Sequence, residues 1–217
     1  EGDAVRRVGL QAHLVPPPAR MAPFADMPAA LRAALPACSR AEVPRVIHQI
    51  WIGPLAVPPA CAAWAAHAAR HGMDYRLWRE SDLAALGLPG NPAFAAMLAR
   101  GDYPGAVDLA RYAILEAAGG IYLDCDFWPA RETLAFEALL PMTGLCTMAE
   151  DVPRLTGKGS LLLANSFIAV PAGHPVMVHL NAVLPRVVAE MPKAPAWWAT
   201  GPLIFTLVAR CGAVALA

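Results

Sequence analysis

Apolar runs and helix-forming stretches alternate along most of the chain, which predicts an α/β protein. Residues 46–52 have the bulk of a buried strand, and residues 74–78 give a second strand. Between them, residues 58–70 are helical by composition and begin with prolines, which a helix tolerates in its first turn. Another helix is predicted over residues 106–118, where Gly119 ends it. This order favours a parallel-rich sheet with a ligand at the carboxyl ends of its strands.

Two stretches flank this α/β region, and a short helix lies within it. Residues 1–42 mix prolines with Ala-rich pieces, so we interpret them as an extension that wraps or tethers, with one short helix near residues 29–34. Ser81 is expected to cap the short internal helix. Residues 203–217 are apolar but shorter than the roughly 20 residues that span a bilayer, so we expect a buried helix and no transmembrane segment. The single domain is predicted to cover residues 43–217.

Two carboxylates, Asp124 and Asp126, stand one residue apart where a short apolar stretch ends. The preceding Gly119-Gly120 pair and the β-prone residues after it predict a turn, a buried strand and then a charged site. If the extended conformation persists, both side chains point the same way and can meet one hard cation. An isolated Asp-x-Asp is also common in solvated turns. The flanks favour a site that binds a metal together with a diphosphate.

Composition adds limits rather than a function. With 217 residues, 57% hydrophobic and 16% charged, the chain is long and apolar enough for one globular domain with a substantial core. Lys+Arg and Asp+Glu balance at 17 each, so no overall field attracts nucleic acid. The five cysteines lack Cys-x-x-Cys spacing, which fits reduced thiols. We therefore predict a cytoplasmic protein and leave peripheral contact with a membrane open.

Several sequence blocks, in the same order, resemble glycosyltransferase family 32. The closest block runs from Asp108-Leu109-Ala110-Arg111-Tyr112 to the segment GGIYLDCD at residues 119–126. The remaining blocks are residues 43–53, 75–78, 165–169, 173–175 and 200–202, so the resemblance spans roughly residues 43 to 207. That family contains yeast-type α-mannosyltransferases and bacterial capsule or lipopolysaccharide sugar transferases, and is related to the glucosylating clostridial toxins. It implies a GT-A type, Rossmann-like nucleotide-sugar-binding fold in a single domain.

The resemblance also implies the chemistry of the site. The donor would be a UDP- or GDP-sugar and the acceptor a glycan or lipid-linked hydroxyl in surface polysaccharide biosynthesis, with Mn²⁺ or Mg²⁺ as the cofactor. Asp126 would be the more direct metal ligand, and Asp124 would contact the donor and support the metal through water. Asp108 and Arg111 share a face of the predicted helix. A surface ion pair is the other interpretation of that spacing, and the family pattern favours donor-sugar binding and catalysis.

Three further residues are assigned to the donor by the same resemblance. Trp51, at the end of the first predicted strand, would stack on the nucleotide base, although a core position is the usual place of such a tryptophan. Ile52 would let backbone groups approach the base, and Asn165 would face the donor sugar. Asn165 is equally a residue that caps its own turn. We leave His48 out of the catalytic set and leave open whether Trp197 and Trp198 contact an acceptor or close the core.

One departure from the family pattern leaves the function open. Many members carry a segment with His and Trp after the Thr-Gly-Pro block, and this sequence reaches Ala217 without it, so we treat the domain as one that is either truncated or completed by another element. Our prediction is a metal-dependent transferase that retains anomeric configuration. Two alternatives remain: a haloacid dehalogenase-like phosphohydrolase, which also uses Asp-x-Asp after an apolar strand, and a non-catalytic protein that binds nucleotide sugars.

Overall fold

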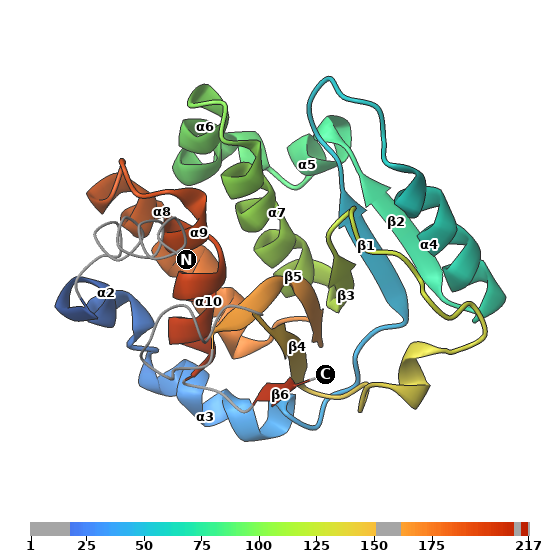
Figure 1. Ribbon diagram of the computed structural model, residues 1–217. Coiled ribbons are helices and arrows are strands. Elements are labelled where there is room, and N and C mark those ends of the chain that lie inside the picture. Colours follow the sequence, from blue (N-terminus) through green and yellow to red (C-terminus); the bar gives the residue numbers. More distant parts are fainter. Residues whose placement is uncertain (1–17, 151–161, 211–213, 217) are drawn as a thin grey trace, which may run out of the picture.

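The computed structural model describes residues 18–150, 162–210 and 214–216, and these form an α/β domain around one sheet (Figure 1). The sheet has six strands in the order β2-β1-β3-β5-β4-β6. Strand β1 pairs in parallel with both β2 and β3, and β4 pairs in parallel with β6. Strand β5 is antiparallel to both β3 and β4. The predicted α/β class is confirmed, and the sheet is mixed because β5 runs against its neighbours. The strand bounds are β1 Val46–Ile50, β2 Asp74–Trp78, β3 Gly120–Leu123, β4 Leu145–Ala149, β5 Leu163–Val170 and β6 Val214–Leu216.

Each face of the sheet carries its own apolar core. Along β3, Ile121 and Leu123 pack into one cluster and Tyr122 into the other, because side chains alternate along a strand. Helix α4 (Pro59–Arg70) covers the first face together with the residues that follow β3, while most other helices cover the second (Figure 1). The helices of the second face are α2 Pro18–Ala25, α3 Ala29–Cys38, α6 Pro92–Ala99, α7 Tyr103–Ala118, α8 Pro175–Glu190, α9 Ala196–Ala199 and α10 Pro202–Ala209.

The predicted helices are present with shifted starts. The α7 helix begins at Tyr103 because Asp102 accepts a hydrogen bond from the Gly105 amide at 3.0 Å, and it ends at Ala118 as expected. The short helix α5 (Glu80–Ala85) is not capped by Ser81, which lies inside it. Asp82 instead accepts from the amide of Arg79, the N-cap residue, at 2.9 Å, so the helix starts two residues earlier than a Ser81 cap predicts.

The Ala/Pro-rich segment packs against the domain. Helix α3 covers and extends the short helix expected near residues 29–34, and α2 precedes it. Met21, Phe24 and Met27 are buried in the same core cluster as α7 and α8. The main-chain carbonyl of Phe24 also lies 2.9 Å from Nε2 of His179. The described part of the segment thus contributes to the core, and a domain boundary at residue 42 stays a prediction.

The single helix expected over residues 203–217 is wrong. Helix α10 ends at Ala209, and Val214–Leu216 forms β6, which pairs in parallel with β4. Hydrogen bonding to a strand that would otherwise be an edge outweighs the helical composition of this apolar stretch. None of the helices in the described ranges is long and apolar enough to cross a bilayer.

The turn between α7 and β3 accepts only glycine at its first position. Gly119 has a φ of 62°, and a Cβ there would lie 2.4 Å from the main-chain nitrogen of Ala172. Since no flexible side chain can move aside at this point, the connection that aims β3 at the Asp-x-Asp segment depends on the absence of a side chain.

We therefore expect Gly119→Ala to lower the free energy of unfolding by about 3 kcal/mol or more, from backbone strain and overlap together. Gly72→Ala is the matched control, because Gly72 has a similar φ of 61° and open space around its Cβ position. That control should lose only about 1 kcal/mol. Urea denaturation of the two variants measures both values, and equal losses would contradict the role assigned to Gly119.

Candidate active site

A cavity of about 830 Å³ opens at the carboxyl ends of β1 and β3 and along one face of α7. Five of the seven residues predicted for the site line it: Trp51, Ile52, Arg111, Asp124 and Asp126. The position agrees with the expectation for an open α/β sheet. The other two predicted residues, Asp108 and Asn165, are buried behind Arg111 and are not part of the cavity wall. The remaining polar or aromatic wall residues are Tyr103, Tyr122, Cys125 and Trp128.

The two carboxylates of the Asp-x-Asp segment reach the cavity by a turn rather than by strand alternation. Strand β3 ends at Leu123, and the amide of Phe127 donates to the carbonyl of Asp124 at 3.2 Å. The extended conformation therefore stops before Asp126, and the predicted side-by-side arrangement on one strand is wrong. The turn is held by the Asp124 amide, which donates to Ser166 at 2.9 Å, and by Cys125, whose thiol lies 3.3 Å from the carbonyl of Ile50.

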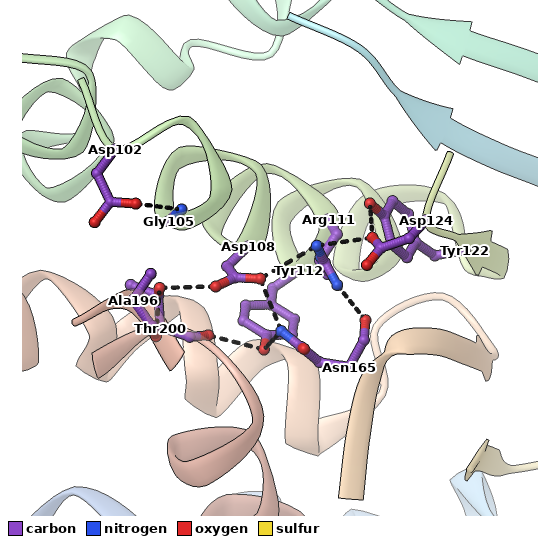
Figure 2. A network of polar contacts seen from close by, with 10 residues as sticks. All are labelled: Asp102, Gly105, Asp108, Arg111, Tyr112, Tyr122, Asp124, Asn165, Ala196 and Thr200. Atoms are coloured by element: carbon purple, nitrogen blue, oxygen red, sulfur yellow. Dashed lines mark hydrogen bonds and ion pairs between the residues drawn. The ribbon is translucent and has the colours of Figure 1, made fainter. Parts of the chain in front are cut away.

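Arg111 is the centre of a buried ion cluster (Figure 2). Its Nη2 lies 3.2 Å from Oδ1 of Asp108 and 3.0 Å from Oδ1 of Asp124, and its Nη1 donates to the main-chain carbonyl of Asn165. The guanidinium stacks over the ring of Tyr122, with Cζ 4.4 Å from the ring centroid. Although burial lowers its pKa, the carboxylates raise the pKa of Arg111 above its usual range, so the cluster always contains a cation.

Asp108 is held from the opposite side of the cluster (Figure 2). Its Oδ1 accepts from Nδ2 of Asn165 at 2.8 Å, and its Oδ2 accepts from the hydroxyl of Thr200 at 2.8 Å. Burial raises the pKa of Asp108 to about 6, against the opposing effect of Arg111. Tyr112 closes the network, because its hydroxyl donates to the Thr200 carbonyl at 2.9 Å and accepts from Asn165 at 2.9 Å. These contacts hold Asp108 and Arg111 in one position.

The two acids at the cavity differ in how many contacts they make with other side chains. Oδ1 of Asp124 accepts from the hydroxyl of Tyr122 at 2.8 Å as well as facing Arg111, and about a third of its side chain is exposed. Asp126 is exposed and has no ion pair within the described ranges. No group of three or more His, Cys, Asp or Glu side chains in the described part of the chain is arranged to hold a metal. Any metal here would need ligands from a diphosphate and water besides these two carboxylates.

The opposite end of the cavity is aromatic. Trp51 is half-buried, and its indole N–H donates to the Leu55 carbonyl at 2.9 Å. The N–H edge of the ring therefore faces the loop that follows β1. Gly53 has a φ of 94° and donates to Oε1 of Glu80 at 2.7 Å. A Cβ at Gly53 would lie 3.2 Å from the ring of Tyr103, so the loop passes directly under that ring.

Contacts place His48 in the core and show how Trp197 and Trp198 pack against each other. Nδ1 of His48 accepts from the Trp78 indole at 3.0 Å and Nε2 lies 3.0 Å from the Gly119 carbonyl. Burial lowers the pKa of His48 to about 4, so this ring is a neutral core residue, as expected. Trp198 is buried and Trp197 packs edge-on against it, with ring centroids 4.4 Å apart. Neither tryptophan lines the cavity.

Sequence reasoning missed four residues of this site. Tyr103 lies eight positions before Arg111 on α7, and it was missed because the predicted helix began only at residue 106. Tyr122 precedes Asp124 by two positions, a spacing that could have suggested a bond between them. Trp128 follows the acidic turn directly and carries no signal of its own. Thr200 is 92 positions from Asp108, and only the folded chain brings them together.

We expect Thr200→Val to lower the free energy of unfolding by about 1 to 3 kcal/mol at pH 7.5, because it leaves a buried carboxylate oxygen of Asp108 without its donor. The hydrogen bond from the Thr200 hydroxyl stabilises the ionised form of Asp108 more than the protonated form, and burial raises the pKa of Asp108 to about 6. The loss should therefore be smaller at pH 5 and grow as the pH rises through 6. Urea denaturation at both pH values tests this.

The control for that measurement is Thr143→Val, at a half-buried threonine outside the cluster. It should change the stability by no more than about 0.5 kcal/mol at either pH. A loss in Thr200→Val that does not depend on pH would show that the hydroxyl does not act through Asp108.

Comparisons with known proteins agree with this geometry. Residues 77–143 match the family model described as the glycosyltransferase sugar-binding region containing a DXD motif, and this range holds Asp108, Arg111 and both acids of the turn. Among solved structures, the PaToxG glycosyltransferase superposes with a TM-score of 0.62 at 17% sequence identity, covering 83% of this chain and 73% of that chain. A search among curated proteins finds no match.

The structural match shows the fold, which is GT-A-like, and the family match shows a glycosyltransferase sugar-binding region over residues 77–143. Neither of these two matches favours the phosphohydrolase alternative. The DXD motif of the family description corresponds to Asp124-Cys125-Asp126, at the mouth of the cavity. Residues 77–143 therefore carry the sugar-binding region of DXD-containing glycosyltransferases, within a domain that has a GT-A-like fold.

Proposed function

We propose that this glycosyltransferase moves a sugar, with retention of configuration and with the help of a divalent metal, from a UDP- or GDP-sugar to an acceptor hydroxyl. The observation that carries the proposal is a single cavity with an aromatic end at Trp51 and Tyr103 and a charged end at Arg111, Asp124 and Asp126. A nucleoside diphosphate sugar has the same polarity along its length, with a flat base at one end and charged phosphates towards the other.

The base is assigned to the aromatic end. Trp51 stacks on it, and the backbone of Ile52 and Gly53 lies at its edge, where the absence of a side chain at Gly53 allows close approach. Contacts within the protein hold the loop in place, since Gly53 donates to Glu80 and the Trp51 indole donates to the carbonyl of Leu55. Preorganisation of this kind reduces the entropy lost on binding.

The diphosphate and the metal are assigned to the acidic turn. The exposed carboxylate of Asp126 and the unengaged Oδ2 of Asp124 fit a hard cation that shares its remaining ligands with phosphate and water. When bound, Mn²⁺ or Mg²⁺ would take up negative charge on the departing diphosphate as a Lewis acid. Arg111 faces the same part of the cavity and adds a second, permanent positive charge.

Asp108 and Asn165 position Arg111 in the present structure, and a direct contact of either with the donor sugar remains a proposal. Both oxygens of Asp108 already accept hydrogen bonds from protein, and the Asn165 carbonyl accepts from Arg111. A sugar hydroxyl reaches Asp108 only if one of these bonds is exchanged. In either role, the pair fixes the guanidinium before the substrate arrives.

Transfer proceeds by attack of the acceptor on the face that the diphosphate leaves. The bond between the anomeric carbon and the phosphate oxygen breaks, a bond from the acceptor oxygen to that carbon forms, and the acceptor proton passes to the departing phosphate. Asp124 and Asp126 are the only carboxylates that line the cavity among the described residues, and both would hold the metal, which leaves no further carboxylate there to form a covalent intermediate. A sugar adduct on a side chain, found by mass spectrometry, would overturn this route.

The biological setting is also part of the proposal. The acceptor is a glycan or lipid-linked hydroxyl in surface polysaccharide biosynthesis, by analogy with the related transferases. The enzyme acts in the cytoplasm, and the unpaired thiols of Cys38, Cys61, Cys125 and Cys146 support a reducing compartment.

The proposal is tested by nucleotide release from a panel of UDP- and GDP-sugars with Mn²⁺ or with a chelator. We expect one donor to be hydrolysed in a metal-dependent way. Asp126→Asn should reduce kcat/KM for that donor by at least about 100-fold, because mutating a residue that only supports a metal ligand already lowers metal affinity or activity by about 10- to 100-fold. Asp74→Asn, an exposed acid on β2, is the control and should keep full activity.

A nucleotide-dependent signal of bound Mn²⁺ in electron paramagnetic resonance should disappear in Asp126→Asn as well. This second measurement does not depend on turnover. Hydrolysis that survives both the chelator and the substitution would contradict the metal role of the acidic turn.

A second test concerns the base. We expect Trp51→Ala to weaken binding of the free nucleoside diphosphate by about 5- to 150-fold, since stacking on a base is worth about 1 to 3 kcal/mol. Trp51→Phe keeps an aromatic face and should recover most of the affinity. Calorimetric titration gives both dissociation constants, and unchanged binding in Trp51→Ala would place this tryptophan in the core role instead.

A further inference from the structure

A second cavity, of about 470 Å³, lies on the other side of the acidic turn. Its wall is apolar apart from His67 and Arg131, and it reaches the buried side chains of Leu123, Phe136 and Phe167 in the core. Two large apolar residues at this cavity, Trp128 and Leu139, are 60% and 61% exposed. Exposed apolar side chains at an apolar hollow mark a binding site rather than a solvated surface.

The turn that holds the carboxylates is the partition between the two cavities. Asp126 lines the first cavity, Phe127 lines the second, and Trp128 lines both. The partition is fixed, because the indole of Trp64 donates to the Phe127 carbonyl at 2.9 Å and its ring stacks on Phe136 with centroids 5.6 Å apart. A molecule in the second cavity is therefore within one side chain of the site where the donor is cleaved.

The charge at this cavity is positive. Arg131 is exposed and has no acidic partner within the described ranges. Of the neighbouring acids, Glu132 lies 2.6 Å from Arg70 and Glu137 contacts Arg45, whereas Asp126 lines the first cavity. An uncompensated guanidinium beside an apolar hollow complements a ligand with an anionic group next to an apolar chain.

We infer that the second cavity binds the apolar chain of an amphiphilic acceptor, whose anionic group lies at Arg131 and whose hydroxyl passes Trp128 to reach the donor sugar. The inference rests on the proposed function and names the class of acceptor for it. The depth of the cavity favours a narrow chain over the surface of a protein, because its floor lies among core side chains. The reaction is unchanged: the acceptor oxygen bonds to the anomeric carbon and its proton leaves with the diphosphate.

The test uses n-octyl phosphate and n-butyl phosphate as probes, added to the whole chain with a chelator present so that no metal recruits the phosphate to the first cavity. Trp64 and Trp128 line the second cavity, so their fluorescence reports binding. Each buried methylene is worth about fourfold in affinity. The four additional methylenes should therefore make n-octyl phosphate bind at least tenfold more tightly.

Two leucine variants distinguish binding in the second cavity from nonspecific binding of the probes to apolar surface. Leu139→Glu places a carboxylate at the apolar cavity and should abolish the difference between the two probes. Leu98→Glu, at a 39% exposed leucine on α6 that is absent from both cavity walls, should leave the difference intact. Arg131→Ala should weaken both probes by a similar factor. Circular dichroism shows that the variants are folded.

Several results would contradict the inference or the proposed function. Equal affinity for both probes, or a chain-length effect that survives Leu139→Glu, would overturn the inference. It would also fail if sedimentation showed a dimer that Leu139→Glu dissociates, since the apolar surface would then belong to a second copy. Donor hydrolysis is measured on a second portion of the same preparation, with Mn²⁺ in place of the chelator: its presence with no chain-length effect counts against this inference alone, whereas its absence counts against the proposed function.

Discussion

The site depends on one buried cation shared between two carboxylates. Arg111 is nearly inaccessible to solvent, and taking a guanidinium out of water is costly unless its hydrogen bonds and its charge are satisfied. Asp108 and Asp124 supply the charge, and Asn165 supplies a carbonyl. Because these three partners come from α7, from the end of β3 and from β5, the arginine ties together the elements that meet beneath the cavity.

This arrangement gives the two motif acids different electrostatic positions. Asp124 already has a cation and a phenol at one oxygen, whereas Asp126 faces solvent without such neighbours. The charges of Arg111, Asp108 and Asp124 do not cancel, and with Asp126 the cavity end carries an excess of negative charge. Under the proposed function, that excess favours a divalent cation, and the cation in turn favours the diphosphate. The acidic turn and the arginine would then act on opposite charges of one metal–diphosphate complex.

The sequence predicted those features that depend only on residues close together in the chain. The prolines before α4, the glycine after α7 and the apolar residues before Asp124 each determine a nearby backbone conformation, and all three predictions hold. The layout of β4, β5 and β6 was not predicted, because it depends on pairing between segments distant in the chain. The place of Asp108 behind Arg111 also depends on Thr200 and Asn165, which arrive only with the second half of the fold. The alternation argument failed for a simpler reason, since the strand ends at Leu123, before either aspartate.

The mixed sheet also determines which parts of the cavity can form separately. The aromatic end is built from residues close to β1 and from the start of α7, all within the first half of the chain and within the parallel part of the sheet. The charged end needs β5, whose antiparallel pairing with β3 brings the carbonyl of Asn165 to Arg111 and the carbonyl of Ser166 to Asp124. A loosening of β5 from β3 would thus release Arg111 and Asp124 and leave the aromatic part of the wall assembled, so under the proposed function nucleotide affinity and catalytic competence are separable.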